Sequence, residues 1–130
     1  MSRKTMLSLA LACVFLVAAG LTIGKGVVLG KGQLPPPQTI TLQAKAGKYN
    51  EVNPTLEVRR GIPVEITIRN DEPGSIPHDF VLVGLGVRTP KAIQPGEVST
   101  LRFTPTQPGE FAYTCTLHPG LMDGRLIVRP

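Results

Sequence analysis

From Thr39 onward, apolar residues occur in short runs that alternate with polar residues. The clearest run covers residues 64–69, where Val64, Ile66 and Ile68 are separated by polar side chains. Because successive side chains of a strand point to opposite faces, this pattern predicts a strand with one buried face. Shorter runs of the same kind begin near residues 39, 56, 80, 101, 111 and 126.

The starts of successive runs lie roughly 8–21 residues apart, and turn-forming pairs separate several of them, such as Pro95-Gly96 and Pro108-Gly109. None of the runs after residue 38 has helical spacing. The 13 Pro and 14 Gly residues also suit many short strands joined by turns. The pattern therefore predicts an all-β domain, an antiparallel β-sandwich of about seven to eight strands.

The N-terminal segment differs from the rest of the chain. Arg3 and Lys4 precede an uncharged apolar stretch at residues 5–23, which is typical of an export signal. Cleavage before Gly20 would remove it, whereas an uncleaved stretch of this length would anchor the chain in a membrane as a helix. A third possibility is lipidation at Cys13. All three place the domain outside the cytoplasm, in the periplasm or an equivalent extracytoplasmic space.

The domain organisation follows from these shifts in composition. We expect residues 1–23 to be a signal peptide or membrane anchor, 24–38 to be a Gly/Pro linker, and 39–130 to be the folded domain. The formal net charge of +5 is concentrated in the N-terminal segment, because residues 38–130 carry ten basic and nine acidic residues. Nothing in this balance predicts a nucleic-acid partner.

The residues with metal-binding chemistry are concentrated near the C-terminus. Cys115, His118 and Met122 follow the run at 111–113 within eight residues, and the domain's other histidine, His78, precedes the run near residue 80. Two imidazoles, one thiolate and one thioether suit copper that cycles between two oxidation states. Zinc also binds Cys and His, but a structural zinc site normally closes with a fourth Cys, His or carboxylate.

The arrangement resembles the cupredoxins, the family of plastocyanin, pseudoazurin and amicyanin. The resemblance rests on Cys115-x-x-His118 with a nearby Met before Gly-Arg-Leu-Ile-Val, and on Pro-His-Asp-Phe at 77–80; it covers about residues 39–129. It implies a Greek-key sandwich with one type I copper ion held by His78, Cys115 and His118, with Met122 as the axial ligand. It also implies that electrons leave through His118, within an apolar patch formed partly by residues 119–121.

Two features depart from the family pattern. Three residues separate His118 from Met122, which differs from the gaps in amicyanin-like and plastocyanin-like loops, so Leu121 is an alternative for the axial position. Asp79 stands where the family often has Asn. We expect Asp79 to accept a hydrogen bond from Thr116, steadying the ligands, and its charge to favour the oxidised ion.

The predicted function is that of a one-electron carrier between redox proteins, and not of an enzyme. The carrier is expected to be a monomer that docks its partners at the His118 patch, with a possible membrane tether through residues 5–23. The alternative is a protein that delivers or sequesters copper, which would release cuprous ion readily. A metal-free interaction module is a third hypothesis, which metal analysis would test.

Overall fold

The computed structural model describes residue 32 and residues 34–130, so the predicted export segment and most of the predicted linker lie outside the described residues. The described part contains nine strands and no helix. The strands are β1 (Gln38–Lys45), β2 (Lys48–Tyr49), β3 (Leu56–Arg59), β4 (Val64–Asn70), β5 (Val81–Leu82), β6 (Val87–Arg88), β7 (Val98–Phe103), β8 (Gly109–Thr114) and β9 (Gly124–Arg129). Within these residues, no helix has the length and apolar character to span a bilayer.

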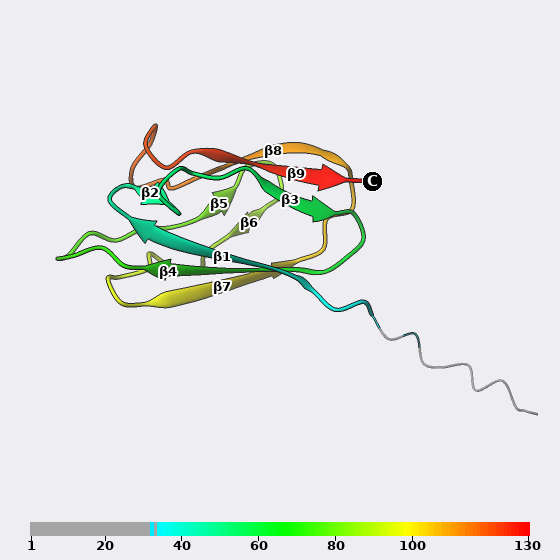
Figure 1. Ribbon diagram of the computed structural model, residues 1–130, viewed down its shortest axis with the longest axis horizontal. Helices are drawn as coiled ribbons and strands as arrows, with labels where there is room; N and C mark the ends of the chain where they lie inside the picture. The colour runs from blue at the N-terminus through cyan, green and yellow to red at the C-terminus, as the bar shows by residue number, and fades with distance from the viewer. Residues whose placement is uncertain (1–31, 33) are drawn as a thin grey trace, which may run out of the picture. The chain divides into compact units, whose positions relative to one another are not determined.

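The strands form two sheets that face each other (Figure 1). One sheet has the order β2-β1-β4-β7 and the other the order β3-β9-β8-β5-β6. In β4 the alternate residues Val64, Ile66 and Ile68 are buried, as the period of two predicts. The predicted all-β sandwich is confirmed, and each of the seven predicted runs corresponds to a strand. The two-residue strands β2 and β6 were not predicted.

The sheets are mixed and not purely antiparallel, which corrects one detail of the prediction. β1 pairs with β4 in parallel, from Gln38 opposite Val64 to Ala44 opposite Asn70, and β3 pairs with β9 in parallel. The five other strand pairings among the described residues are antiparallel. Parallel neighbours need a long connection. Between β1 and β4 the chain forms β2 in the same sheet and then crosses to form β3 in the other sheet.

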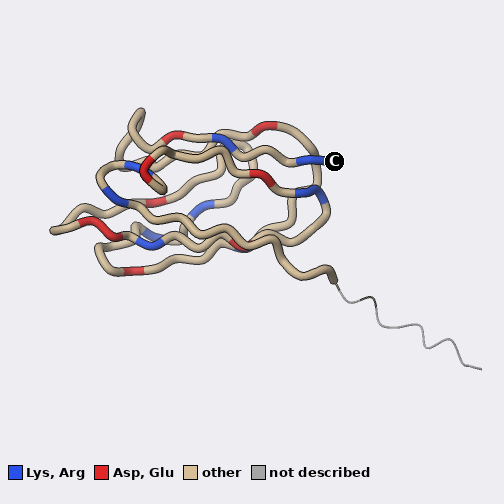
Figure 2. The backbone as a smooth tube through the Cα atoms, in the orientation of Figure 1, with Lys and Arg blue, Asp and Glu red and all other residues tan. Residues whose placement is uncertain are grey.

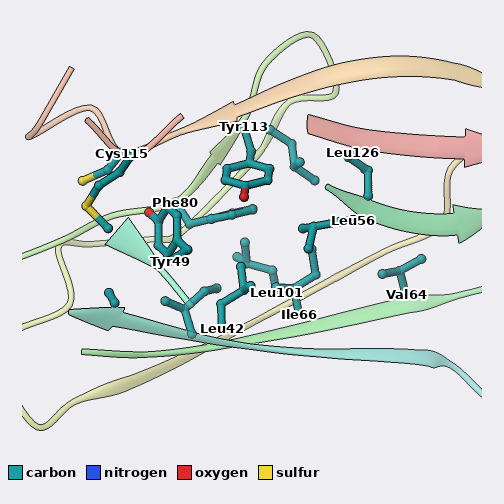
Figure 3. Packing of buried hydrophobic residues seen from close by; sticks show 14 of the residues in the cluster. Leu42, Tyr49, Leu56, Val64, Ile66, Phe80, Leu101, Tyr113, Cys115 and Leu126 are labelled. Atoms are coloured by element: carbon teal, nitrogen blue, oxygen red, sulfur yellow. The ribbon is translucent and has the colours of Figure 1, made fainter. Parts of the chain in front are cut away.

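The hydrophobic core extends along the length of the sandwich. Figure 3 shows Cys115 beside Tyr49 and Phe80 at one end of this core and Val64 at the other. The aromatic rings pack closely, with centroid separations of 5.4 Å for Tyr49 and Phe80 and 5.1 Å for Phe80 and Tyr113. The core thus has a sulfur- and ring-rich end and an aliphatic end.

The N-terminal part of the described chain meets the aliphatic end. Residues 34–37, Leu-Pro-Pro-Pro, line a groove together with Val64, Glu65 and Phe103, at the start of β4 and the end of β7. The Cys115 end lies at the opposite ends of the same strands, because Asn70, the last residue of β4, bonds to Ile93, whose backbone bridges that of His78 beside Cys115. The chain therefore enters the sandwich far from the residues predicted to bind a metal.

Charged residues of both signs are distributed around the domain, as Figure 2 shows. Residues 115–122, in the loop between β8 and β9, are an exception because they carry no Lys, Arg, Asp or Glu; the one charged residue of this loop is Asp123, at its end. This uncharged segment contains Cys115 and His118.

Candidate metal centre

The loop between β8 and β9 turns back on itself and so brings two of the predicted ligands together. The His118 N–H donates to the Cys115 carbonyl oxygen at 3.3 Å, and the Leu121 N–H donates to the His118 carbonyl oxygen at 3.2 Å. Gly120 has a φ of 80°, a left-handed conformation that glycine adopts without strain. These two successive turns place the His118 ring beside the Cys115 sulfur.

His78 reaches the same point from the segment before β5. Its backbone exchanges two hydrogen bonds with Ile93, at 3.1 Å from the His78 N–H and 2.7 Å from the Ile93 N–H. The side chain is fully buried. This backbone bridge holds the main chain from which the imidazole extends.

The three predicted metal-binding side chains converge. The ligand atoms of His78, Cys115 and His118 all lie within 4.8 Å of one another. Cys115 Sγ is 3.9 Å from His78 Nδ1 and 3.5 Å from His118 Nδ1. Bonds of roughly 2.0 Å from nitrogen and 2.3 Å from sulfur to a shared ion would span such separations. The donor set fits a type I copper ion, because two imidazoles and one thiolate are the strong ligands of such sites.

The two candidates for the axial position differ in burial. The Met122 side chain is fully buried and belongs to the same core cluster as Cys115, whereas Leu121 is 62% exposed. A side chain that faces solvent does not also face a buried sulfur, so the structure favours Met122 over Leu121. Axial ligation by Met122 stays a prediction, as do the individual ligand roles of the other three residues.

Asp79 links the two segments that carry the ligands. Its Oδ1 accepts a hydrogen bond from the Thr116 N–H at 2.6 Å, and its Oδ2 accepts one from the Thr116 hydroxyl at 2.5 Å. The expected contact between these residues is confirmed. The Asp79 N–H donates to Cys115 Sγ at 3.4 Å, and the buried Tyr49 hydroxyl donates to the Asp79 carbonyl oxygen. Arg88 lies 4.0 Å from the Asp79 carboxylate and offsets part of its charge.

Burial sets the protonation of the metal-free site. Desolvation raises the pKa of the Cys115 thiol, although backbone N–H groups of Asp79 and Leu117 oppose this. Desolvation also lowers the pKa of His78, so that its imidazole is neutral and offers a lone pair. Cys115 would hold a metal ion as the thiolate, after loss of the thiol proton, and His78 would hold it through a neutral imidazole nitrogen.

Sequence reasoning missed Glu72. This residue is 9% exposed, and its Oε1 lies 3.1 Å from Nε2 of His78, the ring nitrogen that faces away from Cys115. Glu72 lies in a turn-rich segment, Asn-Asp-Glu-Pro-Gly at 70–74, where an acidic side chain is ordinarily exposed. The six-residue separation from His78 follows no helical or strand period, so the sequence held no signal for this contact.

The β-sandwich and the convergent two-histidine, one-cysteine cluster define the class of a type I copper protein. The family model described as "Cupredoxin-like domain" matches residues 11–128. The chain therefore belongs to the cupredoxin-like family, as the resemblance of the motif at 115–122 indicates. No curated protein matches the chain in sequence.

Several solved structures share the fold. Auracyanin B is 22% identical with a TM-score of 0.59, and the match covers 75% of this chain and 93% of auracyanin B. Auracyanin A, a "blue" copper protein from Chloroflexus aurantiacus, is 19% identical with a TM-score of 0.59, covering 72% of this chain and 100% of that one. A copper-containing nitrite reductase from Thermus scotoductus SA-01 is 23% identical with a TM-score of 0.59, but the 73% of this chain that matches corresponds to 28% of the enzyme. At these identities the likeness establishes the fold and not the activity.

Proposed function

We propose that this protein is a type I copper protein that carries single electrons between redox partners outside the cytoplasm. The observation that carries the proposal is the convergence of the ligand atoms of His78, Cys115 and His118 within 4.8 Å of one another, at one end of a cupredoxin-like sandwich. Copper bound there would supply one-electron chemistry by alternating between its two oxidation states. The chain itself supplies a rigid set of donors and a route to the surface.

Rigidity comes from contacts that do not depend on the metal. The backbone bridge to Ile93 holds His78, and the Asp79 carboxylate holds the backbone and side chain of Thr116, next to Cys115. Donors held in this way change position little when the charge of the bound ion changes, and this suits repeated electron transfer.

The route to the surface runs through His118. His78 and Cys115 are fully buried, whereas His118 is partly exposed. The exposed Leu117 and Leu121 lie in the same uncharged segment, residues 115–122. Val52 lies next to Asn53, whose side-chain amide donates to the Leu121 carbonyl oxygen at 2.8 Å. We propose that redox partners dock on this apolar face, defined by Val52, Leu117, His118 and Leu121, because apolar contact brings a partner's centre close without ion pairs that slow its release.

The sequence of residues 1–23 supports an extracytoplasmic location, whether the segment is cleaved or retained as an anchor. The proposal does not include an enzymatic activity. Among the described residues, one cluster of three or more His, Cys, Asp or Glu side chains has metal-binding geometry, and it is the His78–Cys115–His118 set.

The test is to load the full chain with copper and record its visible and electron paramagnetic resonance spectra and its voltammogram. We expect one copper ion per chain, an intense visible band from thiolate, and a reversible one-electron wave; Cys115→Ser should abolish the band. A protein that stays colourless, or whose copper shows only the spectra of nitrogen and oxygen ligands, would refute the proposal.

Copper delivery is the alternative, and exchange separates the two functions. A carrier retains cuprous ion against a competing chelator over many redox cycles, whereas a delivery protein transfers it quickly. We expect the protein to retain cuprous ion, because Cys115 and His78 are buried and a chelator could approach the ion only past His118, the one partly exposed residue of the three. Rapid loss of cuprous ion at chelator concentrations near that of the protein would favour delivery.

A further inference from the structure

Glu72 is a buried carboxylate that the ligand set alone does not explain. It lies two residues after the end of β4, and its side chain is 5% exposed. A buried ionised group is costly unless it is hydrogen-bonded, so its partners indicate what it does. Its Oε1 accepts from the Gly47 N–H at 3.0 Å and lies 3.1 Å from His78 Nε2.

The turn between β1 and β2 is shaped to meet this carboxylate. Ala46 and Gly47 both have left-handed backbone conformations, with φ values of 51° and 67°. This conformation costs energy at alanine, since only glycine adopts it freely. The strained turn directs the Gly47 N–H, and that of Ala46, toward Glu72. The free-energy cost of the left-handed turn is offset because its N–H groups stabilise the buried Glu72 carboxylate.

The backbone of Glu72 is held equally firmly. Its N–H donates to Asn70 Oδ1 at 2.9 Å, and Asn70 Nδ2 donates to the Ile93 carbonyl oxygen at 2.8 Å. Ile93 is the residue that bridges the backbone of His78. Hydrogen bonds thus form a closed circuit from His78 through Glu72, Asn70 and Ile93 back to His78, so the carboxylate and the ring are fixed relative to each other.

The chemistry of this contact decides which nitrogen of His78 carries the proton. A carboxylate is an acceptor, so a neutral imidazole facing it must hold its proton on Nε2. That leaves the lone pair on Nδ1, which faces Cys115 Sγ. The Gly47 N–H and the His78 ring both meet Oε1 of Glu72, at 3.0 Å and 3.1 Å. One oxygen that faces two donors is the arrangement expected of an ionised carboxylate, which only accepts hydrogen bonds.

We propose that Glu72 is a positioning residue and a fixed negative charge for the copper centre: it holds His78 in the Nε2–H tautomer and stabilises the oxidised over the reduced ion. The inference rests on the proposed function, since it assigns a residue that tunes that same site. The negative charge acts through the imidazole, which becomes a stronger donor to the ion when its far N–H is bound by an anion.

The first test compares Glu72→Gln with Glu65→Gln in the copper-loaded full chain. Glutamine retains an oxygen that accepts from Gly47 and His78 but carries no charge. Glu65 is the matched control, because it lies five residues before Asn70 in β4, roughly 16 Å along the strand, and pairs with Arg102. Mutation of a residue that is hydrogen-bonded to a metal ligand, as Glu72 is to His78, typically changes metal affinity by about 10–100-fold.

We expect Glu72→Gln to lower the ratio of cupric to cuprous affinity about tenfold, a rise of about 59 mV in potential for a one-electron couple. Glu72→Asp keeps the charge but shortens the reach, so its potential should stay nearer that of the wild type while the spectra report a displaced His78. A Glu72→Gln potential equal to that of Glu65→Gln would overturn the charge assignment.

The second test does not need copper. Nitrogen-15 chemical shifts of the metal-free wild-type chain report the tautomer of His78 directly. We expect the Nε2–H form, and a predominant Nδ1–H form would overturn the positioning role, even if every Glu72 variant failed to fold. If the wild type did not bind copper, the proposed function would fail, but the tautomer would still decide whether Glu72 positions His78.

Discussion

Among the glycines of the described residues, Gly124 is the one where an added methyl group should cost the most, and it directly follows the loop that carries Cys115 and His118. Gly124, the first residue of β9, lies directly opposite Tyr113 in β8. A Cβ on Gly124 would overlap Tyr113 Cζ and its hydroxyl oxygen, and would lie 2.7 Å from Cε1. The glycine does not have a left-handed φ, so the cost of Gly124→Ala is steric and not conformational.

Tyr113 has little room to move away. It is fully buried, stacks on Phe80 at 5.1 Å and meets Tyr49 edge-on at 5.7 Å, while its hydroxyl donates to the Pro54 carbonyl oxygen at 2.7 Å. Overpacking a core costs about 1–3 kcal/mol, and losing the hydroxyl bond adds about 1 kcal/mol. We therefore expect Gly124→Ala to lower the free energy of unfolding by about 2–4 kcal/mol.

Thermal or urea unfolding of the metal-free protein measures this loss. For a domain of this size each kcal/mol corresponds to about 4–8 °C, so Tm should fall by about 8 °C or more. Gly32→Ala is the control, because its added Cβ meets nothing within 4 Å. In a Tyr113→Leu background the ring is gone, and Gly124→Ala should cost less than about 1 kcal/mol. An equal cost in both backgrounds would show that the clash with Tyr113 is not the cause.

Other variants test the surroundings of the metal centre. Asp79→Asn removes a negative charge beside the ligands and should raise the reduction potential, while Arg88→Gln removes the opposing charge and should lower it slightly; voltammetry showing the same sign for both would contradict this account. Tyr49→Phe leaves the buried Asp79 carbonyl without its hydroxyl partner and should cost about 1–3 kcal/mol in urea unfolding, whereas no change would mean that another donor replaces it. Met122→Leu should retain copper but alter its visible and paramagnetic resonance spectra, and Leu121→Ala should leave them unchanged; the reverse result would assign the axial position to Leu121.

Much of the fold was predictable because its strands bury one face. The alternation of Val64, Ile66 and Ile68 reflects burial directly, and the same holds for the other long strands. The two-residue strands β2 and β6 have too few residues to show a period. The parallel pairing of β1 with β4 and of β3 with β9 could not be predicted either, because side-chain alternation is the same in parallel and antiparallel pairs.

The candidate centre was predictable where its residues are chemically rare. The domain has one cysteine and two histidines, so Cys115, His78 and His118 stood out. The choice between Leu121 and Met122 depended on how the loop turns, which two weak backbone contacts decide. Glu72 was not predictable, because acidic residues are common in turns and its contacts with Gly47 and His78 join segments that the sequence does not show to be neighbours.

Because the chain enters at the aliphatic end of the sandwich, an attachment at the N-terminus lies far from His118. β1 leads from Gln38 toward the metal-bearing end over eight residues, about 23 Å at the usual rise per residue. Anything attached through the N-terminus is thus joined to the pole remote from His118. Attachment through the N-terminus and partner encounter at the proposed face around His118 would therefore use opposite ends of the domain.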